Sequence, residues 1–306
     1  MKKKILLVCA ILLASVIAVV AAACGNSTPT QSVLFNSASE VWGKDDGKET
    51  LTYDVLRGET QIGTFTMTGE CVIGSIVTIG GESVENASGT YFTTSLSVSE
   101  VIDGKVVSTT METQSLLDTG FKVQRSYRKT TTVIGGETEV TEIIGRYTDD
   151  NYNYSYKVDG DEVKTGDVSH SSFSSAAYAD NDFIYQVARL LAGTSGLSVN
   201  VPYYNYDENG DLSTVTMENV SAAVTATNAG IKGMRGDFAD RTGRVWLGTQ
   251  LSVSLTRDFP GSGASFSCHV VTSYTENEQN VTLPYALPGI IKEGDITYAL
   301  TSETRA

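Results

Sequence analysis

The stretch TYFTTSLSVSEVI, residues 90–102, alternates apolar and polar side chains along most of its length. Phe92, Leu96, Val98 and Ile102 fall on one side of an extended chain, and mostly Ser and Thr fall on the other. Successive side chains of a β-strand point to opposite faces, so this pattern predicts a strand with one buried and one solvated face. Such half-buried strands are typical of antiparallel sheets.

The same alternation recurs along the chain from residue 50 onward. In RVWLGTQLSVSL, residues 244–255, the side chains expected on the buried face are Val245, Leu247, Leu251, Val253 and Leu255. Turn-forming pairs separate the runs, and such pairs tolerate the positive φ angles of tight hairpins. These pairs are Gly80-Gly81, Asp103-Gly104, Gly135-Gly136, Asp159-Gly160 and Asn209-Gly210. We therefore expect a large antiparallel sheet built from consecutive hairpins.

One segment, NDFIYQVARLLAG at residues 181–193, interrupts the strands with a helical pattern. It starts with residues that cap helices and ends at Gly193. Its apolar stripe consists of Phe183, Ile184, Val187, Leu190 and Leu191. A single helix among strands must bury such a stripe against the sheet. The sequence therefore predicts a mainly β fold, a large curved antiparallel sheet or half-barrel with one helix, at about 181–193, packed on it.

The N-terminus has the features of an export signal. Three lysines, residues 2–4, precede 19 uncharged residues that end in a row of alanines. The run is also long enough to span a bilayer as a helix, in which case Cys24 would be a thiol near the end of that helix. Either way the lysines keep the N-terminus in the cytoplasm and place the rest of the chain outside.

Ala21, Ala22, Ala23 and Cys24 resemble the lipobox of bacterial lipoproteins, although that family most often has an aliphatic residue such as Leu at the place of Ala21. The resemblance implies that residues 1–23 are a cleaved signal peptide and that Cys24 carries the lipid. The protein would then be anchored in the cell membrane, facing the extracytoplasmic side.

The residues after the proposed lipidation site are Gly, Asn, Ser, Thr and Pro without an apolar period. Such a composition cannot bury enough surface to fold. We expect residues 24–49 to be a flexible tether and residues 50–306 to form a single β-rich domain.

The charge of the chain argues against nucleic acid as a partner. The net charge is −14 and falls to −17 without the three lysines of the signal. Phosphate contacts need clustered Lys and Arg, and the chain has no such block. The sequence also suggests no cofactor.

Cys71 and Cys268 are the cysteines that remain beside Cys24 in the mature chain. Cys71 shares the alternating face of Ile73, Val77 and Ile79, and Cys268 that of Phe266 and Val270, so we expect both to point toward the core. In an oxidising compartment they could form a disulfide that closes a very long loop. Two unpaired buried thiols are the alternative, because Cys is often a small core residue.

No group of residues forms a recognisable catalytic site. His170 stands among serines, but neighbours in sequence do not make a triad, and no Gly-x-Ser-x-Gly elbow occurs. His269 alternates to the face opposite Cys268, which argues against a shared zinc site. We therefore expect a non-enzymatic protein.

DENGDLSTVTME, residues 207–218, partly matches a calcium-binding loop. The possible ligands are Asp207, Asn209, Asp211 and Glu218. However, Leu212 stands where the sharp turn needs Gly, and the preceding stretch with Pro202 predicts a strand rather than a helix. A hairpin that turns at Asn209-Gly210 is the preferred interpretation.

Tyrosines are concentrated in one segment, since nine of the fifteen fall between Tyr147 and Tyr206. Amphipathic rings suit recognition surfaces, whereas cross-strand pairing of the rings is the structural alternative. The candidate ligand wall consists of Tyr152, Tyr154, Tyr156, Tyr203 and Tyr204 from strands and of Phe183, Val187, Leu190 and Leu191 from the helix.

This layout resembles, in architecture and without a diagnostic motif, the half-barrels of the bacterial lipoprotein-carrier superfamily and uncharacterised extracytoplasmic β families. The resemblance implies a lipid or other amphiphilic ligand beneath the helix. We therefore expect a non-catalytic, membrane-anchored lipoprotein that binds an apolar or amphiphilic ligand or an envelope partner. The alternatives are a structural or adhesive surface module and, less in keeping with the residues, a hydrolase with a histidine in a cleft.

Overall fold

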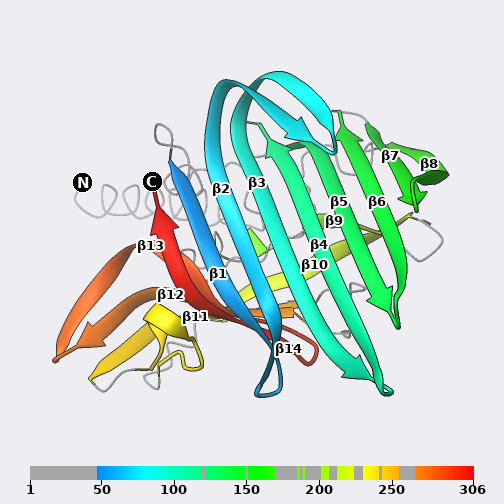
Figure 1. The fold of residues 1–306 in the computed structure, drawn as a ribbon. Helices are drawn as coiled ribbons and strands as arrows, with labels where there is room; N and C mark the ends of the chain where they lie inside the picture. Colours follow the sequence, from blue (N-terminus) through cyan, green and yellow to red (C-terminus); the bar gives the residue numbers. More distant parts are fainter. Residues whose placement is uncertain are drawn as a thin grey trace, which may run out of the picture.

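The computed structural model describes residues 47–118, 122–148, 151–169, 185, 186, 189, 201–206, 212–223, 230–240, 243–254 and 266–306. Fourteen strands form one antiparallel sheet in the order β8-β7-β6-β5-β4-β3-β2-β1-β14-β13-β12-β11-β10-β9 (Figure 1). The strands are β1 (Lys48–Arg57), β2 (Thr60–Ile79), β3 (Glu82–Ile102), β4 (Lys105–Leu117), β5 (Val123–Ile134), β6 (Glu137–Tyr147), β7 (Asn151–Val158), β8 (Asp161–Ser169), β9 (Val201–Tyr206), β10 (Leu212–Ala223), β11 (Arg244–Ser254), β12 (Phe266–Glu276), β13 (Gln279–Glu293) and β14 (Ile296–Arg305).

The first and last strands lie side by side in the middle of the sheet. β1 pairs with β14, and the backbone groups of Lys48 and Ala306 hydrogen-bond to each other. Each further strand pairs with its neighbour in sequence, so β8 and β9 form the two outer edges. The sheet is strongly curved but not closed, which confirms the predicted antiparallel, half-barrel-like fold (Figure 1).

The alternation in residues 90–102 is confirmed over most of β3. Phe92 and Leu96 are each 1% exposed, whereas Ser95 and Ser97 are exposed. Ile102 is an exception and is half-exposed, because the end of the β3–β4 hairpin extends beyond the buried part of the sheet.

The expected turn pairs that lie within the described residues have positive φ angles, as tight hairpins require. These are Gly80-Gly81, Asp103-Gly104, Gly135-Gly136 and Asp159-Gly160. The pair Asn209-Gly210 lies outside the described residues.

The predicted faces of β11 are wrong at its start. Trp246 is buried at 4% exposure and Val245 is exposed, the reverse of the expectation. The pairing of β11 with β12 shifts register between Leu247 and Gly248, and such a bulge switches the faces on which successive side chains lie. The side chains of Leu251 and Val253, and all of Leu255, lie outside the described residues.

β2 and β3 are the longest strands, and beyond Cys71 their hairpin bends back over the convex face of the sheet (Figure 1). We call residues 72–90 the arm. Its pairing is interrupted between Val72 and Val77, where Gly74 has a φ of 60°. Bulges and glycines of this kind allow a hairpin to bend sharply.

The tip of the arm rests on β4–β6. Val77 and Ile79 belong to a hydrophobic cluster with Leu116 and Tyr127. The backbone N–H of Gly80 donates to Gln114 Oε1 at 2.9 Å. Leu116 lies in this cluster whereas its neighbour Leu117 lies in the main core, so the two clusters occupy opposite faces of the sheet.

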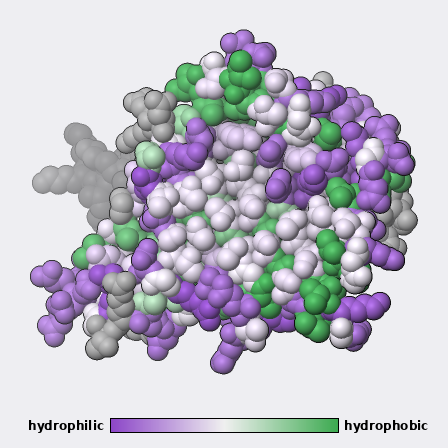
Figure 2. All heavy atoms as spheres, in the orientation of Figure 1, coloured by the Kyte–Doolittle hydropathy of each residue, from purple (hydrophilic) through white to green (hydrophobic). Residues whose placement is uncertain are grey.

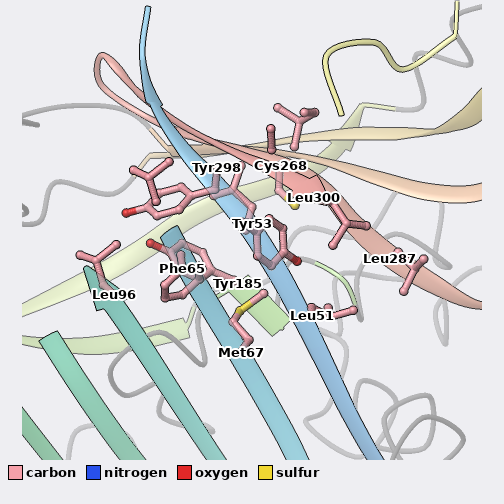
Figure 3. Close-up of a cluster of buried hydrophobic side chains, with 14 of the residues drawn as sticks. Leu51, Tyr53, Phe65, Met67, Leu96, Tyr185, Cys268, Leu287, Tyr298 and Leu300 are labelled. Atoms are coloured by element: carbon pink, nitrogen blue, oxygen red, sulfur yellow. The ribbon is translucent and has the colours of Figure 1, made fainter. Parts of the chain in front are cut away.

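The main core covers the concave face. Its largest fully buried side chains at the centre come from β1, β2 and β14, and they are Tyr53, Phe65 and Tyr298. Tyr185, from the connection between β8 and β9, packs among them (Figure 3). The concave face at the centre of the sheet is therefore covered by a segment of the chain itself.

Candidate functional site

The described part of the predicted helix lies on the concave face. Tyr185, Gln186 and Arg189 have helical backbone and are 0%, 1% and 2% exposed. The Tyr185 ring centroid lies 5.8 Å from that of Phe65 and 5.9 Å from that of Tyr298 (Figure 3). The expected wall residues Phe183, Val187, Leu190 and Leu191 lie outside the described residues.

A buried ion pair fixes this segment to the sheet. Arg189 donates to both oxygens of Glu49, at 2.5 and 3.0 Å, and neither side chain is more than 3% exposed. Arg305 also donates to Glu49, and Gln186 Oε1 accepts from Arg189 at 3.3 Å. Bidentate pairing of this kind compensates for removing both charges from water.

The position of Glu49 corrects the predicted domain boundary. Residues up to 49 were expected in the tether, but β1 begins at Lys48 and Glu49 is 3% exposed. A run of polar residues gives no sign that one of them pairs with a distant arginine. The sequence reasoning therefore missed Glu49, Gln186 and Arg189. The available signal was a Gln and an Arg three residues apart in an otherwise apolar helical segment.

Burial keeps the side chains of Tyr53 and Cys268, at the centre, in their protonated forms near neutral pH. Burial raises the pKa of Tyr53 well above its ordinary value, and its hydroxyl donates to the carbonyl of Pro288 at 2.9 Å. Burial likewise raises the pKa of the Cys268 thiol, which is 0% exposed. Neither group is available as a base or a nucleophile, because both stay protonated and away from solvent.

The tyrosines of β7 form a second region of the concave face. Tyr152, Tyr154 and Tyr156 are all buried, and the rings of Tyr152 and Tyr154 stack at 5.9 Å between centroids. A Cβ added at Gly145 or Gly166, on the neighbouring strands, would lie 2.8 or 2.3 Å from the ring of Tyr152 or Tyr154. The rings therefore lie directly over glycines, which supports the cross-strand pairing alternative.

The other two expected wall tyrosines, Tyr203 and Tyr204, lie on β9, at the opposite edge of the sheet order from β8. Their side chains lie outside the described residues. Of the nine residues predicted to form a ligand wall, the structure therefore describes the side chains of three, those on β7, and it brings these three together.

Buried hydroxyl groups separate the apolar centre from the tyrosines. They are 0–5% exposed and come from β3, β4 and β5: Thr90, Thr94, Thr109, Thr113, Ser115 and Ser126. The Oγ1 atoms of Thr94 and Thr113 lie 2.7 Å apart. The sequence reasoning missed this lining, although the signal was present as Thr on the buried side of residues 90–102.

Two hollows on the surface are lined entirely by described residues. One, of about 460 Å³, lies at the Arg57 end of β1 and is lined in part by Ile62, Val101 and Val106. Arg57 forms two hydrogen bonds with Glu100 there, at 2.6 and 2.9 Å. Neither its lining nor that of the second hollow contains a histidine or a cysteine.

The second hollow, of about 280 Å³, lies between the tip of the arm and β6–β8. Arg146 and Glu82 form an ion pair of 2.5 Å in its wall. Lys157 and Glu162 also line it. The hollow is thus polar, with charges of both signs.

Of the two alternatives for Cys71 and Cys268, the disulfide is absent from the structure, because Cys268 is a free thiol. β1, β14 and β13 lie between the strands of Cys71 and Cys268. Four strand spacings amount to about 19 Å along the sheet, far beyond the reach of a disulfide. Cys268 is buried as expected, whereas Cys71 is only partly buried and Ile73 is exposed. The bulges at the bend of the arm end the alternation that had placed Cys71 on a buried face.

The described residues contain no group of three or more His, Cys, Asp and Glu that could hold a metal ion. Asp207, Asn209 and Asp211 lie outside them, as does the side chain of Glu218 on β10. β9 and β10 pair antiparallel from Val201–Met217 to Tyr206–Leu212, which agrees with the preferred hairpin.

His170 lies outside the described residues. His269 is partly buried on β12, and burial lowers its pKa, with a further contribution from Lys292. In the part of the chain that the structure describes, no helix is long and apolar enough to cross a membrane.

No family model and no curated protein matches the chain. Among solved structures, the chain is similar to a β-barrel-like protein of a domain of unknown function, DUF1849, from Brucella abortus. The two are 11% identical, with a TM-score of 0.44, over 85% of this chain and 98% of that chain. At this level of similarity the comparison carries no information about function.

Proposed function

We propose that the chain is a non-catalytic, lipid-anchored extracytoplasmic surface module whose concave face is filled at its centre by the chain's own Tyr185, Gln186 and Arg189. The observation that most supports this function is the burial of Tyr185 and Arg189 against Phe65 and Glu49. A segment held by aromatic packing and a desolvated ion pair behaves as part of the core. Recognition would then fall to the outer surface, as in a structural or adhesive module.

The convex face of β1–β3 offers such a surface. Its hydroxyl-bearing residues lie in register, for example Thr52 opposite Thr66 and Thr66 opposite Ser95. Figure 2 shows a broad area of intermediate hydropathy over these strands, bordered by hydrophilic atoms and by smaller groups of hydrophobic ones. A broad array of uncharged hydrogen-bonding groups suits contact with another polar surface more than it suits chemistry on a small substrate.

The membrane attachment in this proposal rests on Cys24. Its replacement by Ser should release the protein from the membrane fraction and abolish the added acyl mass on the N-terminal peptide. A matched Cys9→Ser variant, changed within the signal, should keep both. Equal membrane retention by the two variants would contradict lipid anchoring through Cys24.

A second candidate is the binding of an amphiphilic ligand. Two observations favour it: the buried hydroxyls of β3–β5 and the tyrosines of β7, which together give a polar and aromatic lining. In that case a ligand would displace Tyr185 from the concave face.

Native mass spectrometry of Gly25–Ala306, beside the same sample denatured, separates the two candidates. A surface module with a filled interior should show no mass that is lost on denaturation. A co-purified mass that disappears on denaturation would support the amphiphile-binding candidate, and its value would give the class of ligand.

A further inference from the structure

The outer side of the bend in the arm exposes two large apolar side chains. Ile73 is 66% exposed and Ile76 is 65% exposed, while Val72 and Val77, which flank the pair in sequence, are buried. Hydrophobic atoms gather at the edge of the molecule where the arm bends (Figures 1 and 2). Exposed aliphatic groups at a protruding bend mark a contact with an apolar partner.

The chain enters the domain beside this bend. The backbone N–H of Cys71 donates to the carbonyl of Gly47 at 3.0 Å, and Lys48 is in register with Glu70. The 23 residues from Cys24 to Asp46 connect the proposed lipid to this point. As the flexible coil expected from their composition, they have a root-mean-square span of about 26 Å, which keeps this end of the domain on average closer to the lipid than the opposite end.

We infer that Ile73 and Ile76 contact the apolar boundary of the lipid bilayer and orient the domain on the membrane with the bend toward the lipid. This inference rests on the proposed lipid anchor at Cys24. The expected net charge of −17 gives no attraction to an anionic bilayer surface. The contact is therefore apolar in character.

A second exposed apolar group provides a control within the same molecule. Val101, Ile102, Val106 and Ile134 are 46–71% exposed and lie at the other end of the sheet, where Val101 and Val106 line the same hollow as Arg57. The ten residues of β1 separate that end from the point of chain entry by about 33 Å. Of these two exposed apolar groups, the one at the bend therefore lies beside the anchored end of the domain.

The test uses the full, lipidated chain in phosphatidylcholine vesicles that carry brominated acyl chains, which quench tryptophan on contact. Ile73→Trp is compared with Val101→Trp, whose side chain is similarly exposed, after subtraction of the signal from the unmodified protein. We expect quenching at position 73 to exceed that at 101 by at least about twofold, because only the former enters the lipid. Ile76→Trp repeats the measurement if Ile73→Trp alters the circular dichroism spectrum.

Equal quenching at both positions, or stronger quenching at position 101, would overturn the inference. The acyl mass on the N-terminal peptide is measured on the same samples. Its presence together with equal quenching would refute the orientation alone and leave the anchor standing. Its absence would refute the anchor and the orientation together.

Discussion

The concave face of the sheet is filled in two different ways. At the centre, Phe65 and its neighbours on β1 and β14 pack against Tyr185, which is brought from a distant part of the chain. Toward the β8 edge, Tyr152 and Tyr154 instead cover glycines on the strands next to them. The docking of Tyr185 at the centre therefore depends on contacts between residues more than 100 positions apart, whereas the edge depends on hairpin neighbours.

This difference predicts where substitutions should do most damage. A long-range contact orders an otherwise independent segment, so its loss frees both partners and leaves buried groups uncompensated. A cross-strand contact is supported by the backbone pairing on both sides of it. Substitutions at the centre should therefore cost more stability than comparable ones near the β8 edge.

The largest effect is expected from Glu49→Gln. The variant leaves the buried Arg189 without its counter-charge and should lower the free energy of unfolding by about 3–5 kcal/mol. Urea unfolding followed by circular dichroism gives this value. Glu303→Gln, on the adjacent strand and more exposed, is the matched control and should cost less than about 1 kcal/mol. Equal losses in the two variants would remove the distinction between centre and surface.

Phe65→Ala should cost about 3 kcal/mol or more, because it opens a cavity between Tyr53, Tyr185 and Tyr298. Thermal unfolding of the variant and the parent provides the comparison. A loss below about 1 kcal/mol would mean that the aromatic cluster rearranges to fill the space.

Gly166→Ala tests the packing near the β8 edge of the sheet. The added methyl group would lie 2.3 Å from the ring of Tyr154, and the resulting strain should cost about 1–3 kcal/mol. Its exposed neighbour offers the control Thr165→Ala, which should change stability by less than about 0.5 kcal/mol. If Gly166→Ala were as mild as the control, the tyrosine would not lie over this glycine.

Arg146→Ala removes the ion pair that ties the tip of the arm to β6. Both partners are about half-exposed, so global stability should change by at most about 1 kcal/mol. The free energy of local opening at the tip of the arm should fall by more than the global free energy of unfolding. Hydrogen exchange of the amides there, near Gly80, should therefore become faster. Unchanged exchange there would show that Val77 and Ile79 hold the arm without the ion pair.

The smallest effect concerns the pH dependence of stability at His269. Burial lowers the pKa of His269 in the folded state, so folding favours its neutral form. The associated stability is fully present above the unfolded pKa of about 6.5 and is lost as the pH falls through the lower folded value. Unfolding curves at pH 7.5 and 5.0 should therefore differ less in His269→Gln than in the parent protein.

The sequence predicts the local part of this architecture well and the long-range part poorly. Alternation of period two is a property of each strand, so the sheet and its antiparallel character follow from it. The described turns follow from their Gly- and Asp-containing pairs, which are equally local. The same argument fails at bulges, as at Trp246 and Ile73, because one extra residue exchanges the two faces of a strand.

The docking of Tyr185 and Arg189 on the sheet is of a different kind. The helical pattern of residues 181–193 indicates a helix, and its three described residues are helical. The apolar spacing, however, predicts that Phe183 and Val187 are buried and gives no role to Arg189. The partner of Arg189 lies 140 residues earlier in the chain. No local propensity encodes a pairing at that distance, so the buried ion pair required the structure.

The double-mutant cycle of Glu49→Leu and Arg189→Met tests the docking of the segment most directly. Each single variant should be strongly destabilised by the charge it leaves behind, and the double variant should recover much of the loss because both charges are gone. The predicted coupling energy is about 2 kcal/mol or more. Losses that add to within about 0.5 kcal/mol would contradict the account, because they would show that the two side chains do not meet in the folded protein.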